Sequence, residues 1–104
     1  MGGNFHTFNS LSSEEIERGI HIKSLPLENA QLRHMEFEPG SIIPDHRHPE
    51  KVVTIILEGE MVMTVGTETQ TVTKGDVFIV PPNTSHSAHI LEKRVIAVSW
   101  SGNP

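Results

Sequence analysis

Short runs of alternating or apolar residues, separated by turn residues about every ten positions, constrain the fold of this chain more than any other feature. Residues 31–37 and 61–65 alternate in polarity, whereas residues 52–58 are apolar on both faces. Further strands are predicted over residues 69–73, 77–80, 86–91 and 94–100. Short strands between regular turns predict an all-β sandwich or barrel. No helical pattern lies between them, which excludes a parallel βαβ fold.

The stretch before residue 31 permits two interpretations. Ser12 and Glu15 have capping-box spacing, and Gly19 would end a helix of one or two turns. The β-branched residues Ile16, Ile20 and Ile22 instead favour an edge strand over residues 15–24.

Length, charge and composition limit the class of protein. A chain of 104 residues holds one hydrophobic core, so we expect a flexible segment over residues 1–12 and a single β-barrel domain over residues 13–104. The net charge of -5 and the scattered basic residues argue against a nucleic-acid partner. No apolar run approaches the roughly 20 residues of a membrane span, and no leader pattern is visible. A cytoplasmic location is therefore expected.

The seven histidines are the compositional anomaly, and the chain has no cysteine. His46 and His48 are two residues apart, a spacing that puts both on one face of a strand, roughly 6–7 Å apart. His86 follows the rigid turn Pro81-Pro82-Asn83, which could bring a third imidazole to the same ion. Three neutral histidines leave coordination positions open, as catalytic metal sites require. His6, His21 and His34 have no such context, and His89 is expected to point outward.

Two segments resemble the signature motifs of the cupin superfamily. They read Gly40-x5-His46-x-His48, followed by Gly59, and Gly75-x5-Pro81-x-Asn83-x2-His86. The resemblance is to small, single-domain, RmlC-like cupins. It implies a double-stranded β-helix, or jelly-roll barrel, with a divalent metal (Fe, Mn, Ni or Zn) in its mouth. By position, the metal ligands would be His46, His48 and His86.

The chain departs from the cupin pattern at the carboxylate ligand. The motif's usual Glu, four or five residues after the second histidine, is replaced by Val52 and Val53. Glu50 could be a metal ligand, a partner of a ligand, a catalytic group or an ordinary rim carboxylate. Asn83 replaces a glycine and tolerates positive φ nearly as well, and Ile90 replaces the motif's final Asn.

Two further features suggest binding surfaces. Arg33 is in phase with Met35 and Phe37; it either points into the barrel, where it could pair with a substrate carboxylate, or lies on the surface. On residues 52–58, the side chains of Val53, Ile55 and Leu57 should face outward. A homodimer would bury them, and the alternative is cover by the N-terminal segment of the same chain.

These observations favour a metal-dependent enzyme of dioxygenase, isomerase or hydrolase type. Its substrate would be a small oxygenated metabolite such as a sugar, a sugar acid or a related carboxylate. A non-catalytic small-molecule-binding or sensor protein and a structural barrel without metal are the alternatives. Neither a nucleic acid nor a membrane is an expected partner.

Overall fold

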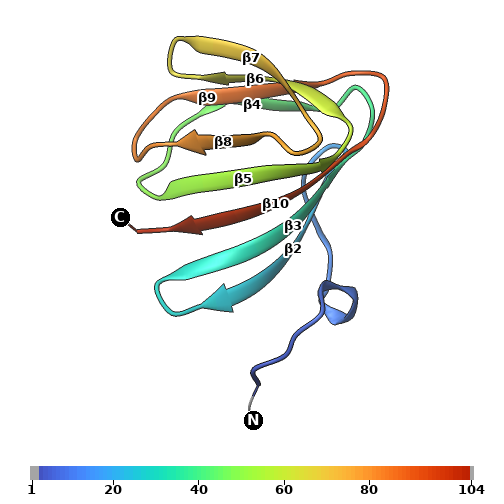
Figure 1. Ribbon diagram of the computed structural model, residues 1–104, viewed down its shortest axis with the longest axis vertical. Coiled ribbons are helices and arrows are strands. Elements are labelled where there is room, and N and C mark those ends of the chain that lie inside the picture. Colours follow the sequence, from blue (N-terminus) through green and yellow to red (C-terminus); the bar gives the residue numbers. More distant parts are fainter. Residues whose placement is uncertain (1–2, 104) are drawn as a thin grey trace.

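The computed structural model describes residues 3–103, and two antiparallel sheets facing each other form its barrel (Figure 1). The larger sheet has the strand order β1 (Glu14–Glu17), β2 (Ile20–Leu27), β3 (Ala30–Phe37), β10 (Val95–Gly102), β5 (Lys51–Glu58) and β8 (Val77–Val80). The smaller sheet has the order β4 (Ile42–His46), β9 (His86–Ile90), β6 (Glu60–Val65) and β7 (Glu68–Thr73). This is the predicted all-β jelly roll, with strands close to the predicted positions.

The N-terminal part of the barrel follows the strand interpretation rather than the helical one. Residues 14–27 form the antiparallel pair β1 and β2, so there are two strands where the sequence suggested one. They are joined by a turn in which Gly19 has a φ of 82°, a conformation that favours glycine. The β-branched isoleucines extend into β2, where Ile20 and Ile22 are buried.

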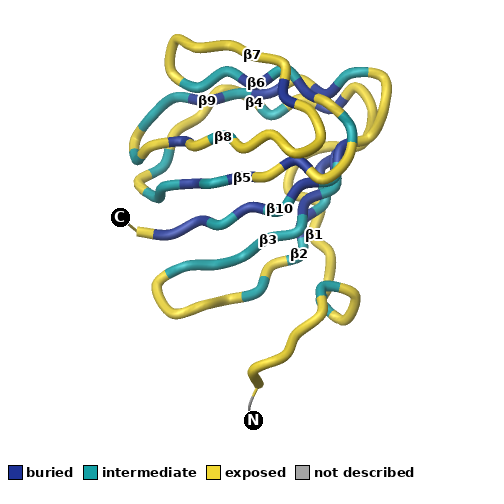
Figure 2. The backbone as a smooth tube through the Cα atoms, viewed as in Figure 1, coloured by how far each residue is buried: buried dark blue, intermediate teal, exposed yellow. Residues whose placement is uncertain are grey.

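The core lies between the sheets and follows the period of two. On β5, Val52, Thr54 and Ile56 are buried, and the alternate residues are on the outer face (Figure 2). The other buried hydrophobic residues come from both sheets: Ile20, Ile22, Met35, Phe37, Met61, Met63, Val72, Val80, Ala88, Ile90, Val95 and Ala97. Inward residues alternate along each strand, so the core takes every second residue of the strands that form it.

The N-terminal segment extends away from the sheets in Figure 1 and carries the short 3-10 helix η1 (Phe8–Ser10). Phe8 lies beside His34 of β3, with 5.6 Å between ring centroids. Ile55 of β5 stays 39% exposed and Ile79 of β8 52% exposed. The N-terminal segment therefore does not cover the outward aliphatic residues of these strands.

Within residues 3–103, no helix has the length and apolar character needed to cross a membrane.

Candidate metal centre

Three histidines converge at one end of the smaller sheet. His46 ends β4 and His86 begins β9, and the two are cross-strand partners. His48 lies in the loop after β4. One ring nitrogen from each histidine lies within 4.8 Å of the others, and the ring centroids are 4.1 to 5.6 Å apart. The structure thus brings together the three residues that the sequence proposes as ligands.

His46 and His48 do not share a strand face as their spacing suggests. Regular pairing between β4 and β9 is interrupted between Ile43 and His46, and β4 ends at His46. The following residues, including Pro49, form a loop, because proline cannot donate a hydrogen bond to a sheet. The loop, rather than strand alternation, directs the His48 ring toward the other two.

Hydrogen bonds tie the two histidine-bearing segments together. The Asn83 backbone N–H donates to the carbonyl oxygen of His48 at 2.7 Å. Asn83 has a φ of 56°, so its occupation of a glycine position agrees with the tolerance expected of asparagine. The Ser85 hydroxyl donates to the carboxylate of Asp45. These contacts fix the loop that holds His48 against the start of β9.

Each histidine uses its Nδ1 atom in the same way. The Nδ1–H group of His46 donates to the carbonyl of Pro44 at 2.8 Å, that of His48 to Glu50 at 3.0 Å, and that of His86 to Thr84 at 2.9 Å. A carbonyl oxygen can only accept, so each ring is placed in the tautomer with an unprotonated Nε2. Hydrogen bonds of this kind orient histidine ligands in metal sites.

Burial also keeps His86 ready to bind a metal. The side chain is in the interior, and desolvation lowers the pKa of His86, with smaller lowering contributions from His46 and His48. The neutral imidazole, which is the form that ligates a metal, is therefore favoured. Three neighbouring histidines with free Nε2 atoms and partnered Nδ1 atoms fit a divalent transition metal and leave coordination positions open.

Among residues 3–103, no carboxylate belongs to this cluster. Val52 is buried in the core opposite Val80, and Val53 lies on the outer face. Glu50 places its Oε1 atom 3.8 Å from Nδ1 of His48. Since Nε2 of His48 is the free nitrogen, Glu50 lies on the side of the ring away from the candidate metal position.

Arg33 lies close to this centre. It shares the inward face of β3 with Met35 and Phe37, and it lines a cavity of about 450 Å³ together with His48 and Glu50. Of the two positions considered for Arg33, the structure therefore shows the one inside the barrel.

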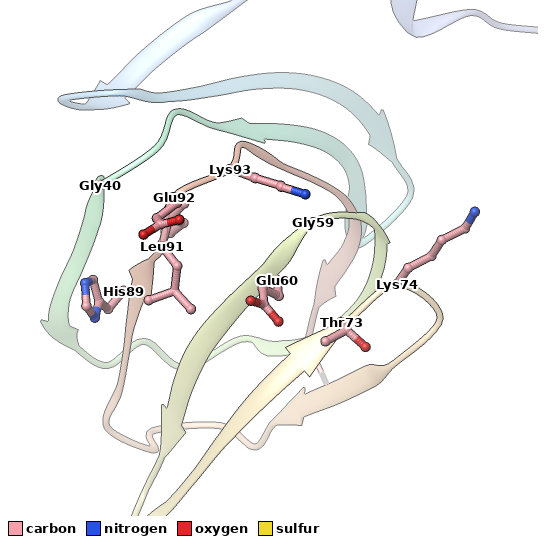
Figure 3. A pocket seen from close by; sticks show the side chains of 10 residues that line it. Gly40, Gly59, Glu60, Thr73, Lys74, His89, Leu91, Glu92 and Lys93 are labelled. Atoms are coloured by element: carbon pink, nitrogen blue, oxygen red, sulfur yellow. The ribbon is translucent and has the colours of Figure 1, made fainter.

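A larger cavity, of about 840 Å³, lies at the other end of the smaller sheet. Figure 3 shows Glu60, Thr73 and His89 around it. It adjoins the start of β6 and the end of β9, whereas His86, at the start of β9, pairs with Val65 at the end of β6. This larger cavity is thus separate from the three-histidine centre. His89 is exposed, as predicted.

The structure also brings together Glu15, His21 and Glu38, a second cluster that the sequence did not predict. Nε2 of His21 is 2.7 Å from Oε2 of Glu38, and Glu15 accepts a hydrogen bond from the Gly19 backbone N–H at 2.8 Å. Glu15 and His21 are cross-strand partners on β1 and β2. The hydrogen bond to Glu38 raises the pKa of His21, and the charge of Glu15 adds to this effect. The β1–β2 pairing was needed to see this, because the helical alternative separates the residues.

The histidine centre in a two-sheet barrel defines a class: small β-barrel proteins with a three-histidine site able to hold a metal. A family model described as a cupin domain matches residues 33–100. The chain belongs to the cupin family.

Solved structures agree with this fold. An RmlC-like cupin from Shewanella frigidimarina has a TM-score of 0.88 at 23% identity, covering 99% of this chain and 93% of that one. KdgF from Halomonas sp. has a TM-score of 0.87 at 20% identity, covering 99% and 96%. Oxalate decarboxylase from Bacillus subtilis, with Mn(II) centres, has a TM-score of 0.82 at 21% identity, covering 94% and 29%. The comparison with curated protein sequences returned no match.

Proposed function

We propose that this protein binds one divalent transition metal through Nε2 of His46, His48 and His86 and is a metal-dependent enzyme acting on a small oxygenated metabolite. One observation carries the proposal: a ring nitrogen of each histidine lies within 4.8 Å of the other two, while all three Nδ1–H groups are held by backbone carbonyls and Nε2 is left free. Surface histidines that meet by chance have no reason to share this arrangement.

The ligand set gives the centre a particular charge. All three ligands are neutral, and Val52 supplies no negative group, so the full charge of a divalent ion would remain on the site. Such a metal supplies Lewis-acid or oxygen-activating chemistry and lowers the pKa of bound water. Among similar structures, the Mn(II) centres of the B. subtilis oxalate decarboxylase support manganese as one candidate; iron, nickel and zinc also suit histidine ligands.

Glu50 is the residue best placed to move a proton. It lines the cavity beside His48, and its backbone carbonyl orients the His48 ring. Its carboxylate is not engaged by the candidate metal position and can exchange a proton with a molecule in the cavity. Glu50→Gln should lower turnover while leaving metal content unchanged.

One observation favours a binding protein without turnover as the second candidate. Among the residues lining this cavity, Glu50 is the one acidic side chain, so a second acid–base group is missing from the described walls. A turnover screen of the metal-loaded protein with sugars, sugar acids and other small carboxylates, with and without oxygen, separates the two candidates.

Metal analysis tests the proposal directly. Protein purified without added metal should contain about one metal ion per chain, or acquire it after incubation with Fe(II), Mn(II), Ni(II) or Zn(II). His86→Ala should weaken the metal affinity by at least about 100-fold, because losing a ligand costs more than losing a group that orients one. His89→Ala, which removes an exposed histidine from the same strand, is the control and should bind like the wild type.

A wild-type protein that remains metal-free after these incubations would contradict the proposal. Equal metal binding by His86→Ala and the wild type would do the same.

A further inference from the structure

The cavity beside the histidines contains a cation without a counter-ion. Nε of Arg33 is buried and has no hydrogen-bond partner among residues 3–103. Within the same residues, no ion pair joins Arg33 to Glu50 or to another carboxylate. Desolvation lowers the pKa of Arg33, with Glu50 acting in the opposite direction. Arginine keeps its proton in proteins, so this group is a poorly satisfied charge in the interior.

The neighbouring polar groups do not satisfy Arg33. Ser99 of β10 is its cross-strand partner, but the Ser99 hydroxyl is hydrogen-bonded to Thr54 at 2.7 Å in the core. These two hydroxyls satisfy each other. A guanidinium offers five donors in a planar fork, and the donors of Arg33 that reach the cavity are available to a molecule that enters it.

We propose that Arg33 anchors the carboxylate of a small oxygenated acid that occupies the cavity between Arg33 and His48 and reaches the metal centre with its other oxygens. The inference rests on the proposed function and specifies its substrate class. A carboxylate matches the guanidinium fork with two parallel hydrogen bonds.

The charge of the cavity favours a monoanion. Arg33 is the cation and Glu50 the carboxylate among the lining residues, which also include Gln31 and Ser101. Among these lining side chains, a phosphate dianion would meet one cation and would be repelled by Glu50, whereas a single carboxylate pairs with Arg33. The charge of the metal lies at the other end of the acid, where its remaining oxygens would bind. A cavity of about 450 Å³ lies within the range that accommodates small metabolites.

Binding of matched acids and neutral analogues tests the proposal. Calorimetry on metal-loaded protein would use glycolate and glucuronate, with ethylene glycol and glucose as their neutral counterparts and inorganic phosphate as another anion. At least one acid should bind the wild type about tenfold or more tightly than its neutral counterpart does. Arg33→Met should remove this preference, and Arg33→Lys should retain part of it, because lysine keeps the charge without the fork. Arg18→Met, which removes an exposed charge that does not line the cavity, should bind like the wild type.

The unfolding temperature of Arg33→Met distinguishes a binding role for Arg33 from a structural one. If Arg33 only stabilised the fold, its replacement would lower the unfolding temperature. Without acid, Arg33→Met should unfold about 4 °C or more above the wild type, because an unpaired interior charge is replaced by an apolar side chain of similar length. The binding acid should raise the Tm of the wild type and leave that of Arg33→Met unchanged.

Several outcomes would overturn the proposal. The first is that neither acid shows binding that depends on Arg33. The second is that phosphate binds as tightly as the acids and also depends on Arg33. The third is that Arg33→Met has a lower Tm than the wild type. Metal content, measured on the same samples, separates these failures from failure of the metal site. Protein that binds metal but shows no acid preference overturns the carboxylate anchor and leaves the metal proposal standing. Acid binding that is unchanged after metal removal overturns the link between the two.

Discussion

The hydrogen bonds at the ring nitrogens of His46, His48 and His86 determine which nitrogen of each ring is free to bind a metal. In each, a backbone carbonyl two residues away accepts from Nδ1–H, and Nε2 is left without a proton. The carbonyls are local in sequence, so each segment supplies the group that orients its own imidazole. The two sheets bring the three rings together.

His21 differs from the histidines of the metal centre because its surroundings favour the protonated ring. Its Nε2 atom contacts the Glu38 carboxylate at 2.7 Å, and this hydrogen bond raises the pKa of His21 above the ordinary value of 6.5. A raised folded-state pKa contributes stability that is fully present below the unfolded value, near pH 6.5, and is lost as the pH rises through the folded value. The contact should therefore stabilise the β1–β2 end of the barrel below about pH 6.5.

An NMR titration of the histidine ring protons checks this. His21 should titrate above 6.5 in the wild type and move back toward 6.5 in Glu38→Gln. The stability difference between the two proteins should shrink as the pH rises through the His21 pKa. A wild-type value at or below 6.5 would show that the Glu38 contact does not form in solution.

At the scale of elements, the turn between β5 and β6 packs closely against the start of β10. Gly59 has a φ of 85°, and a Cβ atom there would overlap the carbonyl oxygen of Arg94 and lie 3.1 Å from Val95 Cγ2. The glycine is therefore required both by its backbone conformation and by the close approach of another strand. It places β5 and β6 in the two different sheets, so it also sets how the barrel closes.

A pair of alanine substitutions separates these two requirements. Gly75 has a φ of 91°, but a Cβ atom there would meet no atom within 4 Å. Gly75→Ala should cost about 1–2 kcal/mol for its left-handed conformation alone. Gly59→Ala should cost roughly 1–3 kcal/mol more, because Arg94 and Val95 must shift. Denaturant unfolding measures both, and equal losses would contradict the role given to the strand contact.

For the whole molecule, the outer face of the larger sheet is the main unexplained surface. Two cross-strand rows of apolar side chains run over it. The first consists of Ile79, Val53, Trp100, Leu32 and Leu25. The second consists of Val77, Ile55 and Val98 and continues to His34. Lys23 ends the second row at β2. Val77 is 55% exposed, which is unusual for a side chain in a continuous apolar row. Since an apolar sheet face can pack on a second copy of itself, we expect a homodimer through these rows.

Light scattering after size exclusion should give the mass of a dimer at micromolar concentration. Ile55→Glu should shift the protein to the monomer, because it places a charge at the centre of the interface, and the metal content should be unchanged. Thr71→Glu, which adds the same charge at an exposed position of β7, should remain dimeric. A monomeric wild type, or a dimeric Ile55→Glu, would contradict this interface.

Alternation and turn residues determined much of this protein from sequence alone. Period two predicted the strands and the inward face of β5, because side-chain direction along a strand is a local property. The spacing of His46, His48 and His86 indicated a metal centre, and Asn83 indicated a left-handed turn. These features depend on neighbouring residues.

Only the tertiary structure decided what depends on register between distant strands. It placed His48 in a loop, left the buried Nε atom of Arg33 without a hydrogen-bond partner among residues 3–103, put Glu50 on the Nδ1 side of His48, and paired His21 with Glu38. The sequence contains all of these side chains, but it does not show how the chain folds around them. Which groups meet, and which remain unpaired, is fixed when the two sheets close over one core.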